Sequence, residues 1–270
     1  MKRIVLSAML LILFSSASFA VLWADKAEVL PAGRWVVEKQ VKYKNYGDTL
    51  SGTAFSGYPT AANGFYFILD IPVDIYYGLS DSLQAGCTVR YESAKRTGYL
   101  TPVEDVGSAG IADSFLHLKY LFTEGLTGQA KLRLPTGDRS GSISFGTGMY
   151  ELYLSMIAQK QMGAGALYGE FGISDYFKRD DGQKNGSKLW LKGSVDQPMT
   201  PSFNLIGSIY IYTAQAGSPM GNPVTYYLFE GGAEWAYAPG LTGRLTLAQQ
   251  VPVLNSANFW QVNIGGTWML

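Results

Sequence analysis

Residues 258–270 read NFWQVNIGGTWML, and this closing stretch decides the fold class. If the chain is extended here, alternate side chains from Trp260 to Leu270 share one largely apolar face, while Gln261, Asn263 and Thr267 share the other. A period of two with one apolar face predicts a half-buried β-strand. Aromatic residues lie near both ends of the apolar face, where strands that cross membranes carry them. We therefore predict a transmembrane β-barrel.

The last eight residues, NIGGTWML, also resemble the C-terminal insertion signal of bacterial outer-membrane proteins. That signal places a polar residue, a glycine, an aromatic residue and an apolar last residue at fixed spacing. Leu270 stands where phenylalanine is most common. The resemblance implies that the barrel-insertion machinery is a partner, which binds through the C-terminal strand.

Composition sets the limits for the rest of the chain. Residues 1–20 begin with Lys2 and Arg3, continue with an apolar run and end in Ser-Phe-Ala, which predicts a secretory signal peptide. No later apolar run reaches the roughly 18 residues of a membrane-spanning helix. The 21 basic and 21 acidic residues balance, so nothing favours nucleic acid as a partner. The single cysteine, Cys87, excludes an internal disulfide.

The alternating pattern recurs along residues 21–270, which we predict to form a single domain. Residues 64–77 show it best: Phe65 and every second residue to Tyr77 are apolar or aromatic, whereas Asp70 and Asp74 lie on the other face. Acidic residues on such an apolar strand require that the face which carries them be in contact with water. The other predicted strands are 34–46, 83–94, 110–122, 128–134, 147–160, 165–177, 187–196, 203–213, 224–238, 241–251 and 258–270. Together they predict an all-β, antiparallel, up-and-down transmembrane barrel of about twelve strands.

The connections alternate between long polar loops and short turns. The long ones include 47–63, 95–109 and 135–145, and the short ones are near 78–82, 123–127, 162–164, 198–202 and 239–240. With residues 21–33 as a short periplasmic lead-in, every long loop falls outside and every short turn inside. This asymmetry is typical of bacterial outer-membrane barrels, and it implies outer-membrane lipid and lipopolysaccharide as surroundings.

Function in the membrane-spanning part has to come from the inward face. The candidate lumen-lining residues are Asp70, Asp74, Arg90, Glu92, His117, Lys119, Lys131, Arg133, Glu151, Tyr153, Tyr168, Glu170, Trp190, Lys192, Glu230, Glu234 and Arg244. They could form a charged constriction that filters solutes, or a lattice of cross-strand ion pairs within a polar lumen. The aromatic residues on the predicted inner face could form a sliding surface for a flat apolar solute, or simply fill a narrow pore. They are Tyr66, Tyr76, Phe115, Tyr153, Tyr168, Trp190, Tyr210 and Tyr212.

The sequence gives little support for an enzyme. His117 is the only histidine, and neither Ser114 nor Ser155 is marked as an activated nucleophile. A histidine-centred metal site would need a second histidine or clustered cysteines. We expect no enzyme activity, no cofactor and no metal.

The most distinctive part of the chain lies between residues 110 and 175. It contains GIAD (110–113), LKY (118–120), KLRLPTGD (131–138), GTG (146–148) and AQK (158–160). These segments resemble the outer-membrane family named for the meta-cleavage pathway of phenol degradation. The resemblance implies a transporter-like barrel that admits hydrophobic or aromatic compounds.

The resulting expectation is a porin-like outer-membrane channel of a Gram-negative bacterium for passive uptake of small hydrophobic or aromatic molecules. Three alternatives concern other functions or surroundings. One is a structural or surface-interaction barrel with a plugged lumen and partner-binding loops. The others are a lipid-directed barrel enzyme that uses His117 and a soluble periplasmic barrel.

Overall fold

The computed structural model describes residues 26–46, 64–98, 106–138, 145–177, 187–215, 223–254 and 259–270. The predicted signal peptide and the predicted loop 47–63 lie outside these ranges, so both stay predictions. Within these ranges, no helix is both long enough and apolar enough to span a bilayer.

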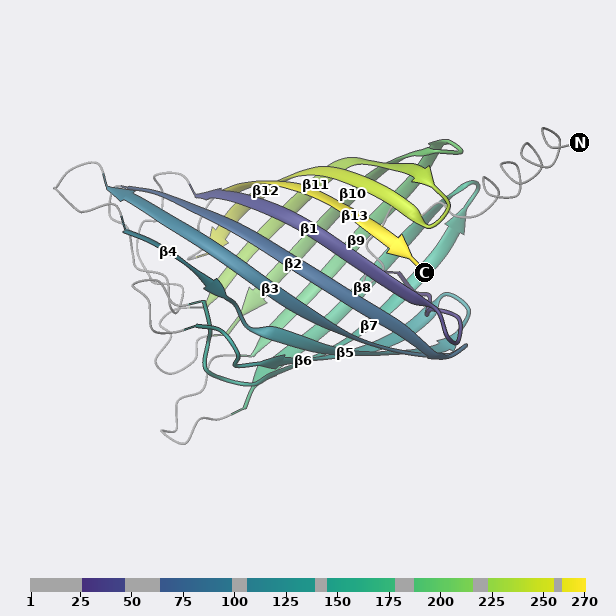
Figure 1. Cartoon of the computed structure of the whole chain (residues 1–270), viewed down its shortest axis with the longest axis horizontal. Helices are drawn as coiled ribbons and strands as arrows, with labels where there is room; N and C mark the ends of the chain where they lie inside the picture. Colours follow the sequence, from purple (N-terminus) through teal and green to yellow (C-terminus); the bar gives the residue numbers. More distant parts are fainter. Residues whose placement is uncertain are drawn as a thin grey trace, which may run out of the picture.

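The described residues form thirteen strands, which run obliquely around a single barrel (Figure 1). Their bounds are β1 (Trp35–Tyr46), β2 (Gly64–Ser80), β3 (Leu83–Gly98), β4 (Val106–Ile111), β5 (Ser114–Thr123), β6 (Leu126–Leu134), β7 (Glu151–Met162), β8 (Gly165–Tyr176), β9 (Lys188–Thr200), β10 (Phe203–Ala214), β11 (Val224–Ala238), β12 (Leu241–Leu254) and β13 (Phe259–Met269). Both β4 and β5 pair with β3, so together they take one position in the barrel. The result is a closed antiparallel 12-strand barrel, and the predicted fold class is confirmed.

The C-terminal strand closes the barrel. β13 pairs with β12 on one side and with β1 on the other, in a register that brings Val41 opposite Ile264. Trp35 and Leu270 exchange two backbone hydrogen bonds of 3.1 and 2.9 Å at its end. Closure is needed because every unpaired backbone group in hydrocarbon costs several kcal/mol.

Five two-residue turns join β2 to β3, β5 to β6, β7 to β8, β9 to β10 and β11 to β12. They lie at the end of the barrel that holds the C-terminus (Figure 1). Gly125, Gly163 and Gly240 supply the positive φ that such tight hairpins require. Because outer-membrane barrels carry short turns on the periplasmic side, this end faces the periplasm.

The two faces of the wall differ as the alternation predicts. Leu118 and Phe171 are about half exposed on the outside, as are Trp35, Trp260 and Trp268. On the inside, the charged side chains of Asp70 and Glu234 are buried. An apolar outside and a polar inside are the reverse of a soluble domain, and they fit a barrel surrounded by lipid.

Several predicted strand limits were wrong, mostly beyond the membrane edge. The stretch 95–109 is not all loop, because β3 continues to Gly98 and β4 begins at Val106; the stretch 110–122 is interrupted at Ala112 and Asp113. Strand β7 begins at Glu151 instead of at 147, and β9 continues through Pro198. Where a strand extends out of the hydrocarbon it has no lipid-facing side, so the apolar alternation that marks it in the sequence disappears.

Replacing Leu118 by arginine tests which face meets lipid. Leu118 lies at the middle of β5 and is 47% exposed. We expect Leu118→Arg to lower the free energy of unfolding from phospholipid vesicles by about 2–4 kcal/mol, because a charge near the bilayer midplane loses its hydration. Unfolding in urea, followed by tryptophan fluorescence, measures this. Thr123→Arg, at the end of the same strand, should cost less than about 1 kcal/mol; equal costs would contradict a lipid-facing Leu118.

Candidate functional site

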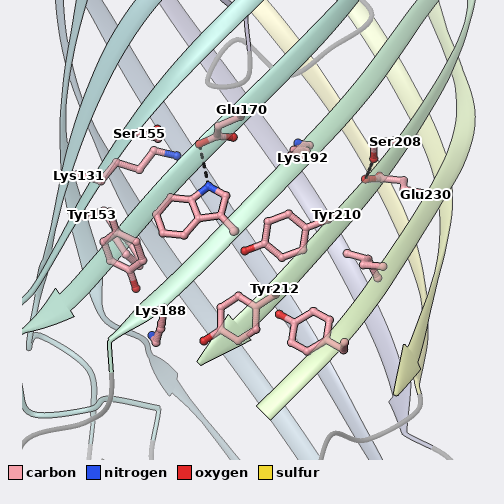
Figure 2. A pocket seen from close by; sticks show the side chains of 14 residues that line it. Lys131, Tyr153, Ser155, Glu170, Lys188, Lys192, Ser208, Tyr210, Tyr212 and Glu230 are labelled. Carbon is pink, nitrogen blue, oxygen red and sulfur yellow. Dashed lines mark hydrogen bonds between the residues drawn. The ribbon is translucent and has the colours of Figure 1, made fainter. Parts of the chain in front are cut away.

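A cavity of about 510 Å³ opens in the lumen along one continuous arc of the inner wall (Figure 2). Its lining comes from β5, β6, β7, β8, β9, β10 and β11. Small-molecule pockets typically have volumes of about 300–1,000 Å³ and combine ring surfaces with a few polar groups. This cavity has both features.

Aromatic rings form two groups around the cavity. Tyr210, Tyr212 and Tyr226 form the first, on β10 and β11, with Tyr212 and Tyr226 stacked at 4.8 Å between centroids. Phe115, Tyr153 and Trp190 form the second, on β5, β7 and β9, with centroid distances of 6.0 Å. Alternation places each ring on the inner face, and strand pairing then brings neighbouring rings together. Ring faces at such spacings suit offset or edge-on contact with a further flat ring.

The charged groups of the cavity are Lys131, Lys188, Lys192, Glu170 and Glu230. Both acids accept hydrogen bonds from neutral donors. Glu170 accepts one from the Trp190 indole at 3.1 Å, and Glu230 accepts bonds from Thr246, from Asn263 at 3.0 Å and from Ser208 at 3.5 Å. The lining therefore carries one more cation than anion.

Glu151 organises the wall beside the cavity. Its side chain is fully buried and accepts hydrogen bonds from Lys188 and Ser174, each at 2.7 Å, and from Tyr153. Arg133 forms an ion pair with it at 3.0 Å, and the guanidinium lies 5.3 Å from the centroid of Phe115. One carboxylate thus holds two cations whose charged heads also lie over aromatic rings.

A second charged cluster lies on β2 and β3. Arg90 bonds Asp70 at 3.0 and 3.3 Å and also bonds Glu92. Further along the wall, Thr88 Oγ1 is 2.5 Å from both Asp74 Oδ1 and His117 Nε2. His117 therefore bonds a threonine, and neither Ser114 nor Ser155 bonds it within the described residues.

The remaining candidates lie elsewhere in the lumen. Lys119 is 1% exposed, Tyr168 packs with Ala166, and Arg244 pairs with Glu234 at 3.3 Å. None of these residues lines the cavity. Of the seventeen sequence candidates, the cavity brings together Lys131, Tyr153, Glu170, Trp190, Lys192 and Glu230.

Residues 26–30 are not a periplasmic lead-in, which corrects the expectation for this part of 21–33. They lie inside the lumen, where Ala27 O accepts a hydrogen bond from Thr127 at 2.7 Å and Leu30 N donates one to Gln84 at 2.9 Å, whereas residues 31–33 are exposed at the rim. Leu30 is fully buried against Val36 and Tyr76. The hydrophobic effect explains this position, because the apolar Leu30 side chain leaves water when it packs against these two residues. We call residues 26–30 the lumenal segment.

The lumenal segment should dock more tightly at alkaline pH. Burial lowers the pKa of Lys26 from 10.5 to about 8, although four acids oppose the shift, namely Glu28, Glu234, Asp196 and Glu38. Between these two values the docked segment has lost a proton that the undocked segment still binds, so docking strengthens as the pH rises through this window. We expect conductance in planar bilayers to fall from pH 8 to pH 10. Lys26→Met should remove this fall in conductance. If the variant responded to pH like the unaltered protein, the prediction would be contradicted.

The motif residues between 110 and 148 fasten a loop to the wall. Asp113, between β4 and β5, accepts hydrogen bonds from Gly137 N at 3.0 Å and from Thr147 N and Oγ1 at 2.8 and 2.9 Å. Gly137 and Gly146 approach so closely that a Cβ on Gly137 would lie 2.5 Å from Gly146 Cα. The PTGD and GTG segments are therefore structural. They also place Phe145 against Ile68, Ala94 and Ala112 at the mouth of the lumen.

Loss of the Asp113 carboxylate should release this loop. Asp113→Ala leaves two backbone N–H groups and one hydroxyl without their acceptor, at a cost of about 2 kcal/mol or more. We expect added protease to cut residues 135–150 faster in intact cells, as measured by the rate at which fragments appear. Asp175→Ala, near the same end of the barrel, is the matched control and should leave the rate unchanged. Equal rates for both variants would show that Asp113 does not hold the loop.

Sequence reasoning missed four residues that line the cavity, namely Lys188, Ser208, Tyr226 and Leu228. It also missed Tyr176, whose hydroxyl accepts a hydrogen bond from Lys188 at 2.6 Å. The signal for all five was present, because each is an even number of residues away from an inward residue on the same strand.

Comparison with solved structures places the barrel among outer-membrane proteins. An outer-membrane channel from Pseudomonas putida F1 aligns with a TM-score of 0.72 at 14% identity, over 90% of this chain and 98% of that one. The translocator domain of the autotransporter NalP from Neisseria meningitidis aligns with a TM-score of 0.55 at 11% identity, over 99% and 95%. The β domain of the Bordetella autotransporter BrkA gives 0.54 at 10%, over 88% and 100%.

No protein-family model matches the sequence, and no curated protein matches it. The structural matches share little sequence, so they show the fold. Together with the closed barrel and its apolar outer face, they identify a bacterial outer-membrane protein.

Proposed function

We propose that this protein is a passive channel that admits small hydrophobic or aromatic molecules through the outer membrane. The single observation that carries the proposal is the cavity of about 510 Å³ between two groups of aromatic rings. Rings on the inner wall offer an apolar surface in an otherwise wet lumen, so a flat solute can leave water there without meeting lipid. No bond is made or broken.

Two further features support the cargo class. The motif segments between residues 110 and 160 resemble the family named for the meta-pathway of phenol degradation, whose members are regarded as channels for such compounds. The fold is also that of an outer-membrane channel from Pseudomonas putida F1. We further propose that residues 1–20 direct export and that β13 engages the insertion machinery.

A structural or surface-interaction barrel is the second candidate. It is favoured by the lumenal segment and by Phe145, which occupy parts of the lumen near its two ends. If both remain docked, the loops could bind a partner while nothing passes. Conductance separates the candidates, because only the first requires an open path.

Uptake by whole cells tests the proposed function. A porin-deficient strain that expresses the protein should accumulate ring-labelled aromatic solutes faster than the same strain with an empty vector. The matched control expresses a variant with Tyr210, Tyr212 and Tyr226 replaced by aspartate, which removes one group of rings. Equal uptake by all three strains, for every aromatic solute tried, would refute the proposal.

A further inference from the structure

Lys131 differs from the other charged residues around the cavity. Its side chain projects into the cavity from β6 (Figure 2), yet it makes no hydrogen bond or ion pair with any described residue. Its electrostatic neighbours are His117 and Asp74, and Asp74 already accepts a hydrogen bond from Thr88 at 2.5 Å. Lys188, by contrast, is held by Glu151 at 2.7 Å. The Lys131 ammonium group is thus available to a solute.

The surroundings of Lys131 are aromatic. It pairs across strands with Tyr153, whose ring lies 6.0 Å from Trp190. The stacked pair of Tyr212 and Tyr226 borders the same cavity. A flat ring that lies between the two groups of aromatic side chains can therefore direct a substituent at Lys131.

We propose that the cavity preferentially binds flat aromatic solutes that carry a single negative charge, aromatic carboxylates above all. The proposal rests on the proposed function and narrows its solute class. The ring of such a solute stacks between the two aromatic groups, while its carboxylate pairs with the available ammonium group of Lys131. A nonaromatic anion loses the stacking contact and a neutral aromatic solute loses the ion pair, so each should bind less tightly.

The number of acidic and basic residues around the cavity favours a solute with a single negative charge. Glu170 and Glu230 repel anions, but both are engaged by hydrogen bonds from Trp190, Asn263 and other neutral donors of the wall. With three lysines against these two acids, the lining has one cation in excess. The second charge of a dianion would have no excess cation to pair with, and a cationic solute would meet net repulsion.

Equilibrium dialysis against the full-length mature protein in lipid nanodiscs tests the proposal. The probes are benzoate, cyclohexanecarboxylate (an anion without an aromatic ring) and benzamide (a neutral aromatic). We expect benzoate to bind about fivefold more tightly than either of the others, the effect of one partly screened ion pair or one ring contact. Empty nanodiscs give the background, and the heat-modifiable shift of the folded barrel on gels verifies each variant.

Variants of Lys131 separate the ion pair from the stacking contact. Lys131→Met should reduce benzoate binding to the level of benzamide and leave benzamide unchanged, whereas Lys131→Arg should retain the preference. Lys160→Met, which removes an exposed lysine near the end of β7, is the matched control and should change nothing.

Three results would overturn the proposal: equal binding of benzoate and benzamide, an unaltered preference in Lys131→Met, and no binding of any probe. Whole-cell uptake decides the proposed function separately. If aromatic solutes enter cells but benzoate has no advantage, only the charge preference fails. If no aromatic solute enters, the proposed function fails whatever the binding shows.

Discussion

Replacing Leu30 by serine is expected to raise the single-channel conductance several-fold. The lumenal segment occupies the periplasmic end of the pore, and its main anchor is Leu30, which is fully buried against Val36 and Tyr76. Losing that contact weakens docking by about 2 kcal/mol, which is roughly a thirtyfold change in the equilibrium constant for docking. Released from the wall, the segment would leave a wider water-filled path. Planar-bilayer recordings at fixed salt measure the effect.

The control removes the same residue type from the outside of the barrel. Leu79 is exposed near the same end, so Leu79→Ser should leave the conductance unchanged. If both variants conduct like the unaltered protein, the lumenal segment does not limit the current. If the conductance of all three proteins were also negligible, the structural or surface-interaction barrel would gain support.

Neutralising Glu151 should cost about 3 kcal/mol of the free energy of unfolding. Its carboxylate is fully buried, and the two cations that it holds, Arg133 and Lys188, are each less than one-fifth exposed. Glu151→Gln keeps the shape but leaves these cations close together without a counter-charge, and breaking a buried pair in this way is strongly destabilising. Urea unfolding from phospholipid vesicles gives the difference.

Glu230→Gln is the matched substitution. Glu230 accepts hydrogen bonds from Thr246, Asn263 and Ser208, which are all neutral. An amide oxygen can accept from the same donors, so this variant should lose no more than about 1 kcal/mol. Similar losses in the two variants would mean that charge pairing at Glu151 contributes little and that water in the lumen compensates the cations.

Much of the fold could be predicted because the membrane imposes a simple pattern. In β2, the apolar series from Phe67 to Tyr77 and the acids Asp70 and Asp74 alternate, and they do face opposite sides of the wall. The limits of β3 and β4 could not be predicted, because neither side of a strand meets lipid once it leaves the bilayer. The same loss of pattern hid the break at Asp113.

The candidate site was only partly predictable. Alternation assigns Tyr153, Trp190 and Lys131 to the inner face, but it does not tell which inward residues meet. That depends on register and on the curvature of the closed wall, which bring β5 and β11 to one cavity. The position of Lys26 and Leu30 was beyond any pattern, since a short segment without periodicity can dock wherever it finds a partner surface.

By itself, the sequence determined that this chain forms a barrel, which residues face lipid and where the chain closes, because a period of two is dictated by the strand and by the two solvents on its sides. Only the tertiary structure decided which charges pair, that the lumenal segment lies in the pore, and that Lys131 makes no hydrogen bond or ion pair with the described residues. Even a pair on neighbouring strands, such as Arg133 with Glu151, depends on the register and curvature of the wall, so its distance becomes known only when the wall has formed.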